Sequence, residues 1–363
     1  MGYPDTFEGF MVQSQDDWTN FKKQEFKPKK FQERDIDIEI ECCGVCGSDV
    51  HTISGGWGGA PMPLCVGHEV IGKAVKVGDG VKTVKVGDRV GVGAQIWACL
   101  ECKPCKTDNE NYCPNKIDTY GAPYPEEMGG VIAQGGYASH IRAHEYFTFK
   151  IPDNIPSEEA APMMCAGLTT YSPLVRAGVG PGKKVAIVGV GGLGMHAIMW
   201  ANALGAEVYV LSHSPDKEKA AKDLGAKEFI STVDKDWAKP WAFTFNFMLN
   251  TADATHQFDL AAYLGTLAVN GQMHHVGLPD KPLPELKAQM FAPNGCSMGG
   301  SHIGSRPEMF AMLKLASEKK LKPIIETIPV SEDGCKKAVL GVHNNEVRYR
   351  YTLTDFNKAF PNR

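Results

Sequence analysis

The sequence predicts an α/β protein in which a doubly wound domain adjoins a second domain that is rich in β-strands. The first reason is length, since 363 residues exceed what one hydrophobic core normally spans and two domains are expected. The second is that the chain up to about Lys150 alternates short strand-like runs with glycine-rich turns. The third is that strand-like and helix-like segments alternate from Lys183 onward.

The segment that ends near Lys150 has the pattern of an antiparallel β domain. Residues 35–41 (DIDIEIE), 70–78 (VIGKAVKVG) and 89–94 (RVGVGA) are strand-like runs separated by turns. Alternation of apolar and polar side chains along such a run is typical of a strand with one buried face. We therefore expect a partly barrel-like sheet in this domain.

The part of the chain after Lys183 has the order of a doubly wound sheet. Residues 183–190 (KKVAIVGV) form a short apolar run typical of a buried parallel strand. A helix is expected at 192–205. The later elements of the same pattern are strands at 207–212, 228–230, 243–252 and 271–278, and a helix at 216–226. The tail from about Ser301 contains a helix at 307–320 and then strands, and this tail is expected to rejoin the β-rich domain.

The composition argues against two classes of function. Hydrophobic residues make up 43% of the chain and charged residues 22%, as in soluble globular proteins, and the net charge of −4 lacks the basic surplus of a nucleic-acid-binding protein. The uncharged stretch from Val185 to Ala206 is long enough to span a membrane, but four glycines interrupt it, so a strand–turn–helix unit is favoured. We expect no membrane association. Because no secretory signal is recognisable, we expect a reducing, cytoplasmic environment, in which clusters among the 11 cysteines bind metal.

Four closely spaced cysteines predict a structural zinc site. Cys99, Cys102, Cys105 and Cys113 follow the pattern C-x2-C-x2-C-x7-C. Tetrahedral zinc needs four soft donors at about 2.3 Å, and short loops allow four thiolates to close around it. Because the protein would fill all four positions, no position remains for a substrate. The alternatives are chance clustering, a disulfide pair, or a nucleic-acid-binding zinc knuckle, although the flanking residues 106–112 (KTDNENY) offer no basic surface.

A second, dispersed set predicts a catalytic zinc. Cys46 lies in GVCGSDVH, His68 in GHE and Cys165 in MMCAGL. Taken singly, Cys165 is explained as a core residue and His68 as a hydrogen-bonded core histidine. Together they supply two cysteines and one histidine, which is the catalytic zinc ligand set of alcohol dehydrogenases. Three protein ligands leave the fourth position open for water or a substrate oxygen.

A glycine-rich loop predicts a dinucleotide site. It matches G-x-G-x-x-G directly after a strand and before a helix, which gives a tight turn, close approach to a pyrophosphate and a helix amino terminus facing its charge. The residues of this loop that we expect to bind cofactor are Gly189, Gly191, Gly192, Leu193 and Gly194.

The residues after the second strand favour NADP(H) over NAD(H). NAD-binding domains usually carry an Asp or Glu at this position, whereas this chain has Ser212, followed by His213 and Lys217. A carboxylate would repel a 2′-phosphate. Ser212 can instead form a hydrogen bond with it, and Lys217 can offset its charge. Asp216 argues the other way unless it points to solvent at the start of the helix.

At this point the motifs resemble those of the medium-chain zinc dehydrogenases. The resemblance rests on GHE at 67–69, the four-cysteine segment, QGGYA at 134–138, AAPMMCAGLTTYSPL at 160–174 and GVGGLG at 189–194. Within that family, GVCGSD, the Gly56-Trp57-Gly58 sequence and VRYRYTL at 347–353 resemble the cinnamyl alcohol dehydrogenases. The match extends from about Phe7 to the last few residues.

The resemblance implies a GroES-like catalytic domain that is interrupted by a Rossmann domain, with the active site in the cleft between them. We expect residues 1–157 and 297–363 to form the catalytic domain, with a structural zinc lobe at about 95–116. Residues 158–296 would form the Rossmann domain. The resemblance also implies a homodimer with two zinc ions per chain.

The resemblance further implies roles for individual residues. Ser48 would pass a proton between the substrate oxygen and the cofactor ribose, His51 would carry it to solvent, and Glu69 would lie beside the zinc. The remaining residues expected to contact the cofactor are Thr169, Thr251, Ser301 and Arg348.

Three positions depart from the family pattern. His302 stands where an apolar residue commonly lines the substrate pocket, to which Trp57 would also contribute. His274 and His275 also replace residues that are commonly apolar. The subfamily name therefore does not define the substrate.

The sequence as a whole predicts a zinc-dependent oxidoreductase that transfers hydride between NADP(H) and an aldehyde or primary alcohol, acting as an aldehyde reductase. Aromatic substrates of the cinnamyl or benzyl type and medium-chain aliphatic ones are both expected. The alternatives are a polyol or secondary-alcohol dehydrogenase, a non-catalytic NADP-binding zinc protein and a nucleic-acid-binding zinc protein.

Overall fold

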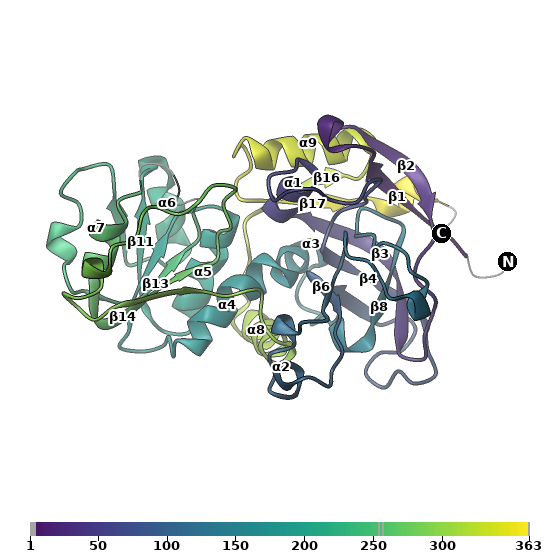
Figure 1. Ribbon diagram of the computed structural model, residues 1–363, viewed down its shortest axis with the longest axis horizontal. Coiled ribbons are helices and arrows are strands. Elements are labelled where there is room, and N and C mark those ends of the chain that lie inside the picture. Colours follow the sequence, from purple (N-terminus) through teal and green to yellow (C-terminus); the bar gives the residue numbers. More distant parts are fainter. Residues whose placement is uncertain (1–4, 253–254, 256–257, 362–363) are drawn as a thin grey trace. The chain divides into compact units, whose positions relative to one another are not determined.

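The computed structural model describes residues 5–252, 255 and 258–361, and these form two compact units. The first unit combines the chain up to Cys165 with the chain from Ser305 onward, and the second is Ala166–Gly304. In Figure 1 the purple, blue and yellow ribbons therefore belong to the first unit, and the second unit is drawn in teal to green. The expected boundaries at 157 and 296 lie a few residues earlier. The difference at 157 arises because α3 (Ser157–Ala160) and η5 (Ala161–Met164) pack on strands of the first unit.

The first unit is built on a seven-stranded sheet. In sheet order its strands are β16 (Ile325–Pro329), β17 (Arg350–Thr354), β3 (Asp35–Val45), β4 (Glu69–Val77), β5 (Arg89–Val92) and β9 (Thr148–Lys150), with β8 (His140–His144) paired to β3. All pairs are antiparallel except β16 with β17. The C-terminal strands thus complete the sheet, as expected.

Strand β3 is buried on both faces, which its alternating sequence did not predict. Ile36, Ile38 and Ile40 are inaccessible, and so are Asp35 and Asp37 on the same strand. The two carboxylates are tolerated because Lys29 pairs with Asp35 and Arg142 donates to Asp37 Oδ1 at 2.7 Å.

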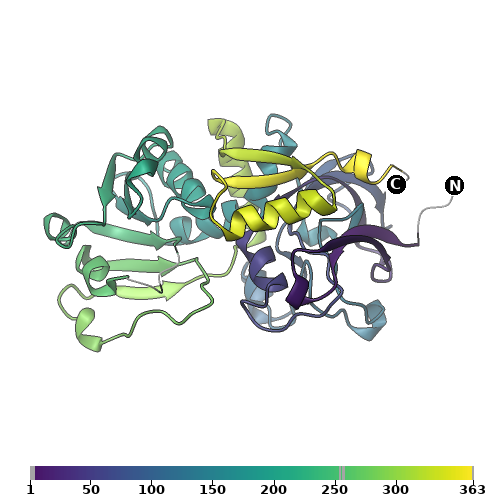
Figure 2. The same ribbon diagram turned by 90° about the horizontal axis from the view of Figure 1, so that it is seen from above.

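Smaller elements surround this sheet. They are the hairpin β1 (Phe7–Val12) and β2 (Phe21–Phe26), the helices α1 (Gly47–Ile53), α8 (Arg306–Lys319), α9 (Glu332–His343) and α10 (Phe356–Ala359), and the short helices η1 (Gln15–Asp17), η3 (Glu126–Met128) and η4 (Glu145–Phe147). The cysteine lobe contains β6 (Gln95–Trp97), α2 (Lys103–Lys106), η2 (Glu110–Tyr112) and β7 (Ile117–Asp118). Helix α9 lies beside β16 and β17, drawn in yellow in Figure 2.

The second unit is a six-stranded parallel sheet with the doubly wound order that the sequence predicts. In sheet order its strands are β12 (Glu228–Ser231), β11 (Glu207–Ser212), β10 (Lys184–Val188), β13 (Phe245–Asn250), β14 (Leu267–His275) and β15 (Ser297–Gly300). Its helices are α4 (Ala166–Arg176), α5 (Gly192–Ala203), α6 (Glu218–Asp223) and α7 (Leu260–Gly265), with short helices η6 (Pro215–Lys217), η7 (Lys239–Trp241) and η8 (Ala288–Met290). The order reverses between β10 and β13, and ligands of such sheets bind at the carboxyl ends of the strands there.

The stretch from Val185 to Ala206 forms β10, a turn and α5. Within the described residues, no helix combines the length and the apolar character that crossing a membrane would require.

Candidate active site

Four possible metal ligands meet in the first unit, although they are far apart in the sequence. The ligand atoms of Cys46, His68, Glu69 and Cys165 all lie within 4.8 Å of one another, and all four residues are buried. Cys46 follows β3 and caps α1, and His68 leads into β4 at Glu69. Because β3 and β4 are antiparallel with Gly44 opposite Glu69, their pairing brings these residues together. Cys165 directly follows η5, which packs on the same strands.

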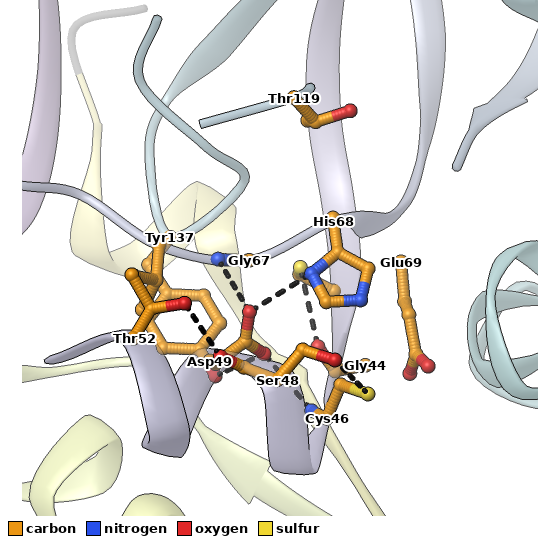
Figure 3. Close-up of polar contacts among 12 residues, drawn as sticks. Gly44, Cys46, Ser48, Asp49, Thr52, Gly67, His68, Glu69, Thr119 and Tyr137 are labelled. Carbon is orange, nitrogen blue, oxygen red and sulfur yellow. Dashed lines mark hydrogen bonds and ion pairs between the residues drawn. The ribbon is translucent and has the colours of Figure 1, made fainter. Parts of the chain in front are cut away.

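Asp49 holds the imidazole of His68. Asp49 Oδ1 lies 3.0 Å from His68 Nδ1, and Asp49 Oδ2 accepts a hydrogen bond of 2.9 Å from the backbone N–H of Cys46 (Figure 3). The other ring atom, His68 Nε2, is buried and has no hydrogen-bond partner among the described residues. Burial opposes a charged imidazole, but Asp49 and the Cys46 sulfur raise the pKa of His68 well above its usual value. The surroundings of Nε2 therefore favour a positive charge, which fits a metal ligand better than a core histidine.

The two cysteines of the cluster also suit a cation. A hydrogen bond from Cys165 holds the pKa of Cys46 well below its usual value, with help from Arg350 and His68 and against the effect of burial. The same hydrogen bond and burial raise the pKa of Cys165 well above its usual value. Cys46 is therefore the thiolate of the pair, and thiolate sulfur is a preferred zinc ligand.

Glu69 is neutralised by Arg350. The Arg350 guanidinium donates to Glu69 Oε1, and the two side chains are only 7% and 0% exposed. Burial raises the pKa of Glu69 to about 7, although Arg350 opposes this. A Cβ at Gly44 would clash with Glu69 Oε2, so this carboxylate needs a glycine on the neighbouring strand.

Helix α1 places the expected proton-carrying residues beside the cluster. Ser48 Oγ lies 3.6 Å from Cys46 Sγ, and His51 follows three residues later on the same face of the helix. The Trp57 indole stacks on the His51 imidazole with 4.8 Å between ring centroids and 12° between planes. Trp57 is 44% exposed, so part of its ring remains accessible.

The four-cysteine lobe has the geometry of a second metal site. The sulfurs of Cys99, Cys102, Cys105 and Cys113 all lie within 4.8 Å of one another. The sulfur atoms are 3.4 Å apart for Cys102 and Cys105 and 3.5 Å apart for Cys113 and Cys99, and all are free thiols. These separations exceed a disulfide bond and correspond to four donors around one ion. The disulfide alternative is therefore wrong.

The glycine-rich loop lies in the second unit, between β10 and α5. Gly189 has a φ of +89°, and a Cβ at Gly194 would clash with the Gly189 carbonyl oxygen, so the turn and the close helix packing both require glycine. A Cβ at Gly191 would meet no atom within 4 Å. Gly191 caps α5, so the helix amino terminus is open to a phosphate group.

Other residues expected to contact the cofactor divide between the two units. In the second unit, Ser212 ends β11 and its Oγ accepts a hydrogen bond from Ser214 N at 3.1 Å, while Thr251 Oγ1 donates to Val188 O at 2.8 Å. The others in that unit are Thr169 on α4, His213, Lys217 in η6, Ser301 and the pocket candidate His302. Arg348 lies in the first unit and is exposed.

Comparison with known proteins places these features in one family. The Alcohol dehydrogenase GroES-like domain matches residues 32–153, and the Zinc-binding dehydrogenase domain matches residues 192–318. The chain is 45% identical over 99% of its length to NADP-dependent alcohol dehydrogenase 6 of Saccharomyces cerevisiae, with 99% of that protein covered. The chain belongs to the zinc-binding alcohol dehydrogenase family.

Two further relatives differ in their named substrates. The Mannitol dehydrogenase of Petroselinum crispum is 38% identical, with 90% of this chain and 96% of that protein covered. A cinnamyl alcohol dehydrogenase structure from Sorghum bicolor is 35% identical with a TM-score of 0.90, and the match covers 96% of this chain and 97% of that one. The expected family and fold class, a GroES-like domain with a Rossmann-type domain, are confirmed.

Two functional residues of this alcohol dehydrogenase were not predicted from its sequence. Asp49 stands three residues after Cys46, the position from which an acid can cap the start of a helix, and this spacing was a usable signal. Arg350 lies far along the chain from Glu69, in a motif that indicates family resemblance but no role for the arginine. No local pattern identifies it.

Proposed function

We propose that this alcohol dehydrogenase uses zinc to transfer hydride between NADP(H) and an aldehyde or primary alcohol, acting as an aldehyde reductase. The observation that carries the proposal is the buried cluster of Cys46, His68, Glu69 and Cys165, with ligand atoms within 4.8 Å of one another. Cys46, His68 and Cys165 would hold the zinc, with Glu69 beside it. When bound there, zinc supplies a Lewis acid that polarises the substrate carbonyl.

Ser48 and His51 would manage the proton of the reaction. Reduction of an aldehyde creates an alkoxide that must gain one proton. The Ser48 hydroxyl lies at the edge of the cluster and would donate that proton. His51, on the same face of α1, would then resupply Ser48 from solvent through the cofactor ribose.

The preference for NADP(H) is supported by the end of β11. Ser212 stands where an acid would repel a 2′-phosphate, and His213 and Lys217 follow it. The name of the yeast relative states the same dependence for that protein. The open start of α5 at Gly191 would bind the pyrophosphate, with Gly189, Gly192, Leu193 and Gly194 completing the loop. Thr169, Thr251, Ser301 and Arg348 would make the remaining cofactor contacts.

The accessible Trp57 ring favours aromatic aldehydes. The indole is held flat against His51 and presents an apolar surface on which a phenyl ring could stack. His302 would add a polar group to the pocket. The second candidate is a polyol dehydrogenase activity, which the mannitol-oxidising relative named above favours.

We also propose a cytoplasmic homodimer. The 11 free cysteines suit a reducing compartment. Strand β15 is an edge strand of the described parallel sheet, and an edge strand can pair with a second copy. Light scattering after gel filtration would test the dimer, and a monomeric mass would contradict it.

The decisive experiment is a substrate panel with the zinc-loaded protein. NADPH consumption should be rapid with cinnamaldehyde and benzaldehyde, slower with mannose or fructose, and abolished by a zinc chelator. If mannose or fructose were reduced faster than the aromatic aldehydes, the second candidate, a polyol dehydrogenase, would be favoured. Cofactor binding without turnover on any substrate would instead indicate a non-catalytic NADP-binding protein.

A further inference from the structure

A pair of polar side chains joins the carboxyl ends of β13 and β14 in the second unit. Asn250 ends β13 and His275 ends β14, and the two residues lie opposite each other in this parallel pair of strands (Figure 1). Asn250 Nδ2 lies 2.9 Å from His275 Nδ1. Asn250 is inaccessible to solvent, so water cannot replace this contact. Ligands of doubly wound sheets bind at the carboxyl ends of the strands, so the pair lies at the edge where the cofactor is expected.

The backbone sets the direction of the hydrogen bond between these side chains. The N–H of Ala252 donates to Asn250 Oδ1 at 3.2 Å, so the amide oxygen faces the backbone and the amide nitrogen faces the histidine. Because an amide nitrogen only donates, His275 Nδ1 is the acceptor, and the network assigns the ring hydrogen to Nε2. Burial, and then the nearby His274, lowers the pKa of His275. The ring is therefore neutral, and Nδ1 remains able to accept.

The turn formed by Thr251 and Ala252 supports both ends of the glycine-rich loop. Thr251 Oγ1 donates to Val188 O at 2.8 Å and lies 3.4 Å from Gly189 O. A Cβ at Gly189 would lie 2.9 Å from the Ala252 Cβ, and a Cβ at Gly194 would lie 3.1 Å from Thr251 Oγ1. The loop and the turn are thus in close contact, and a small movement of the turn would displace the loop.

His275 offers no hydrogen bond of its own to a cofactor. Its second ring nitrogen, Nε2, is inaccessible to solvent and has no hydrogen-bond partner among the described residues. A ligand at the strand ends cannot reach this covered nitrogen, and Nδ1 is occupied by Asn250. Any effect of His275 on cofactor binding therefore passes through Asn250. The Asn250 main chain is held separately, since its carbonyl oxygen accepts from the Val276 N–H at 3.0 Å, so only its side chain depends on His275.

We propose that His275 is a positioning residue for the cofactor: by accepting the Asn250 amide, it holds the Thr251–Ala252 turn against the glycine-rich loop. An apolar residue at position 275 would leave the buried amide nitrogen of Asn250 without its acceptor, which is costly. Asn250 would then rotate toward another partner and release the Ala252 N–H, and the loop would lose a fixed support. This inference rests on the glycine-rich loop being the cofactor site of the proposed function.

The test measures NADPH binding by titration calorimetry in the zinc-loaded protein, without substrate. His275→Met and His275→Gln form a matched pair of similar length, in which only the glutamine oxygen can accept a hydrogen bond from Asn250. His274→Met is the control, because His274 is the adjacent residue of β14, points to the other face of the sheet and lies against Phe247 with 5.9 Å between ring centroids. Asn250→Leu, alone and combined with His275→Met, completes a double-mutant cycle.

We expect His275→Met to raise the dissociation constant of NADPH by about threefold to thirtyfold, as for residues that affect a ligand without contacting it. His275→Gln should have a smaller effect, and His274→Met should bind NADPH like the wild type. The double variant should bind NADPH no more weakly than Asn250→Leu alone, because His275 acts only through Asn250. In rate assays of His275→Met, the KM for NADPH should rise and the KM for the aldehyde should not. A merely structural role would lower the free energy of unfolding and leave the NADPH affinity of the folded protein unchanged.

Three results would overturn the inference. One is wild-type NADPH affinity in His275→Met, whatever the stability of that variant. Another is an equal loss of affinity in His274→Met, and the third is additive losses in the double variant. If His275→Met does not fold, wild-type NADPH affinity in Asn250→Leu would overturn the inference instead. A wild-type protein that does not bind NADPH would refute the proposed cofactor site itself.

Discussion

The buried ion pair between Glu69 and Arg350 predicts a large loss of stability when only one partner is removed. Arg350→Met keeps an apolar side chain of similar length but leaves the Glu69 carboxylate without its cation. Because the two side chains are 0% and 7% exposed, solvent cannot replace the lost partner. Breaking a buried pair in this way costs about 3–5 kcal/mol. We therefore expect the free energy of unfolding to fall by about that amount in urea titrations followed by circular dichroism.

The double variant Glu69→Gln with Arg350→Met tests whether that loss of stability comes from an uncompensated charge. If the cost comes from an uncompensated charge, the neutral amide should restore much of the stability, and the two substitutions should be strongly non-additive. The exposed pair of Lys219 and Asp223, with side chains 86% and 61% exposed, gives the matched control, since Lys219→Met should change stability little. An Arg350→Met protein as stable as the wild type, or additive effects in the double variant, would refute the reasoning.

The remaining predictions concern pH, turnover, cofactor choice and the second metal. Burial, then the charge of Arg34, lowers the pKa of His144 to about 4, so its neutral form stabilises the fold fully above pH ~6.5 and this stabilisation is lost as pH falls from there toward 4. As pH falls over that range, the free energy of unfolding of His144→Gln should decrease by up to about 3 kcal/mol less than that of the wild type. Parallel curves of unfolding free energy against pH for the two proteins would contradict this. Ser48→Ala should lower kcat about 100-fold or more with zinc content unchanged, and wild-type turnover would remove Ser48 from the relay. Ser212→Asp should shift the ratio of kcat/KM values about tenfold or more toward NADH, and an unchanged ratio would show that another residue selects the cofactor. Cys105→Ser should leave one zinc per chain by mass spectrometry of metals, whereas two would contradict a four-cysteine site.

The features that the sequence predicted best are local ones. The four cysteines of the lobe lie within fifteen residues, and loop length alone requires their sulfurs to be near one another. The glycine-rich loop is equally local, because the strand before it and the helix after it are recognised from the residues that directly adjoin it. Strand β3 was predicted only in part, since its pattern indicated a polar face. The cations that neutralise Asp35 and Asp37 come from Lys29 and Arg142, which only the folded chain brings to that face.

The candidate zinc cluster could be proposed from residue types, but its environment depends on strand register. Gly44 lies opposite Glu69 in the β3–β4 pair, and this pairing places Cys46 near His68. A slip of one residue would turn each side chain to the other face of the sheet and separate the ligands. Arg350 reaches the same point only because Tyr351, the next residue of β17, pairs with Val45 on the other side of β3. The pairing of these three strands therefore sets the spacing of the candidate ligands. Gly44 has no side chain, and this leaves the space in which Glu69 and Arg350 form their ion pair. The sequence around Arg350 contains no pattern that indicates its ion pair with Glu69. The charge balance of the site could therefore be known only from the three-dimensional structure.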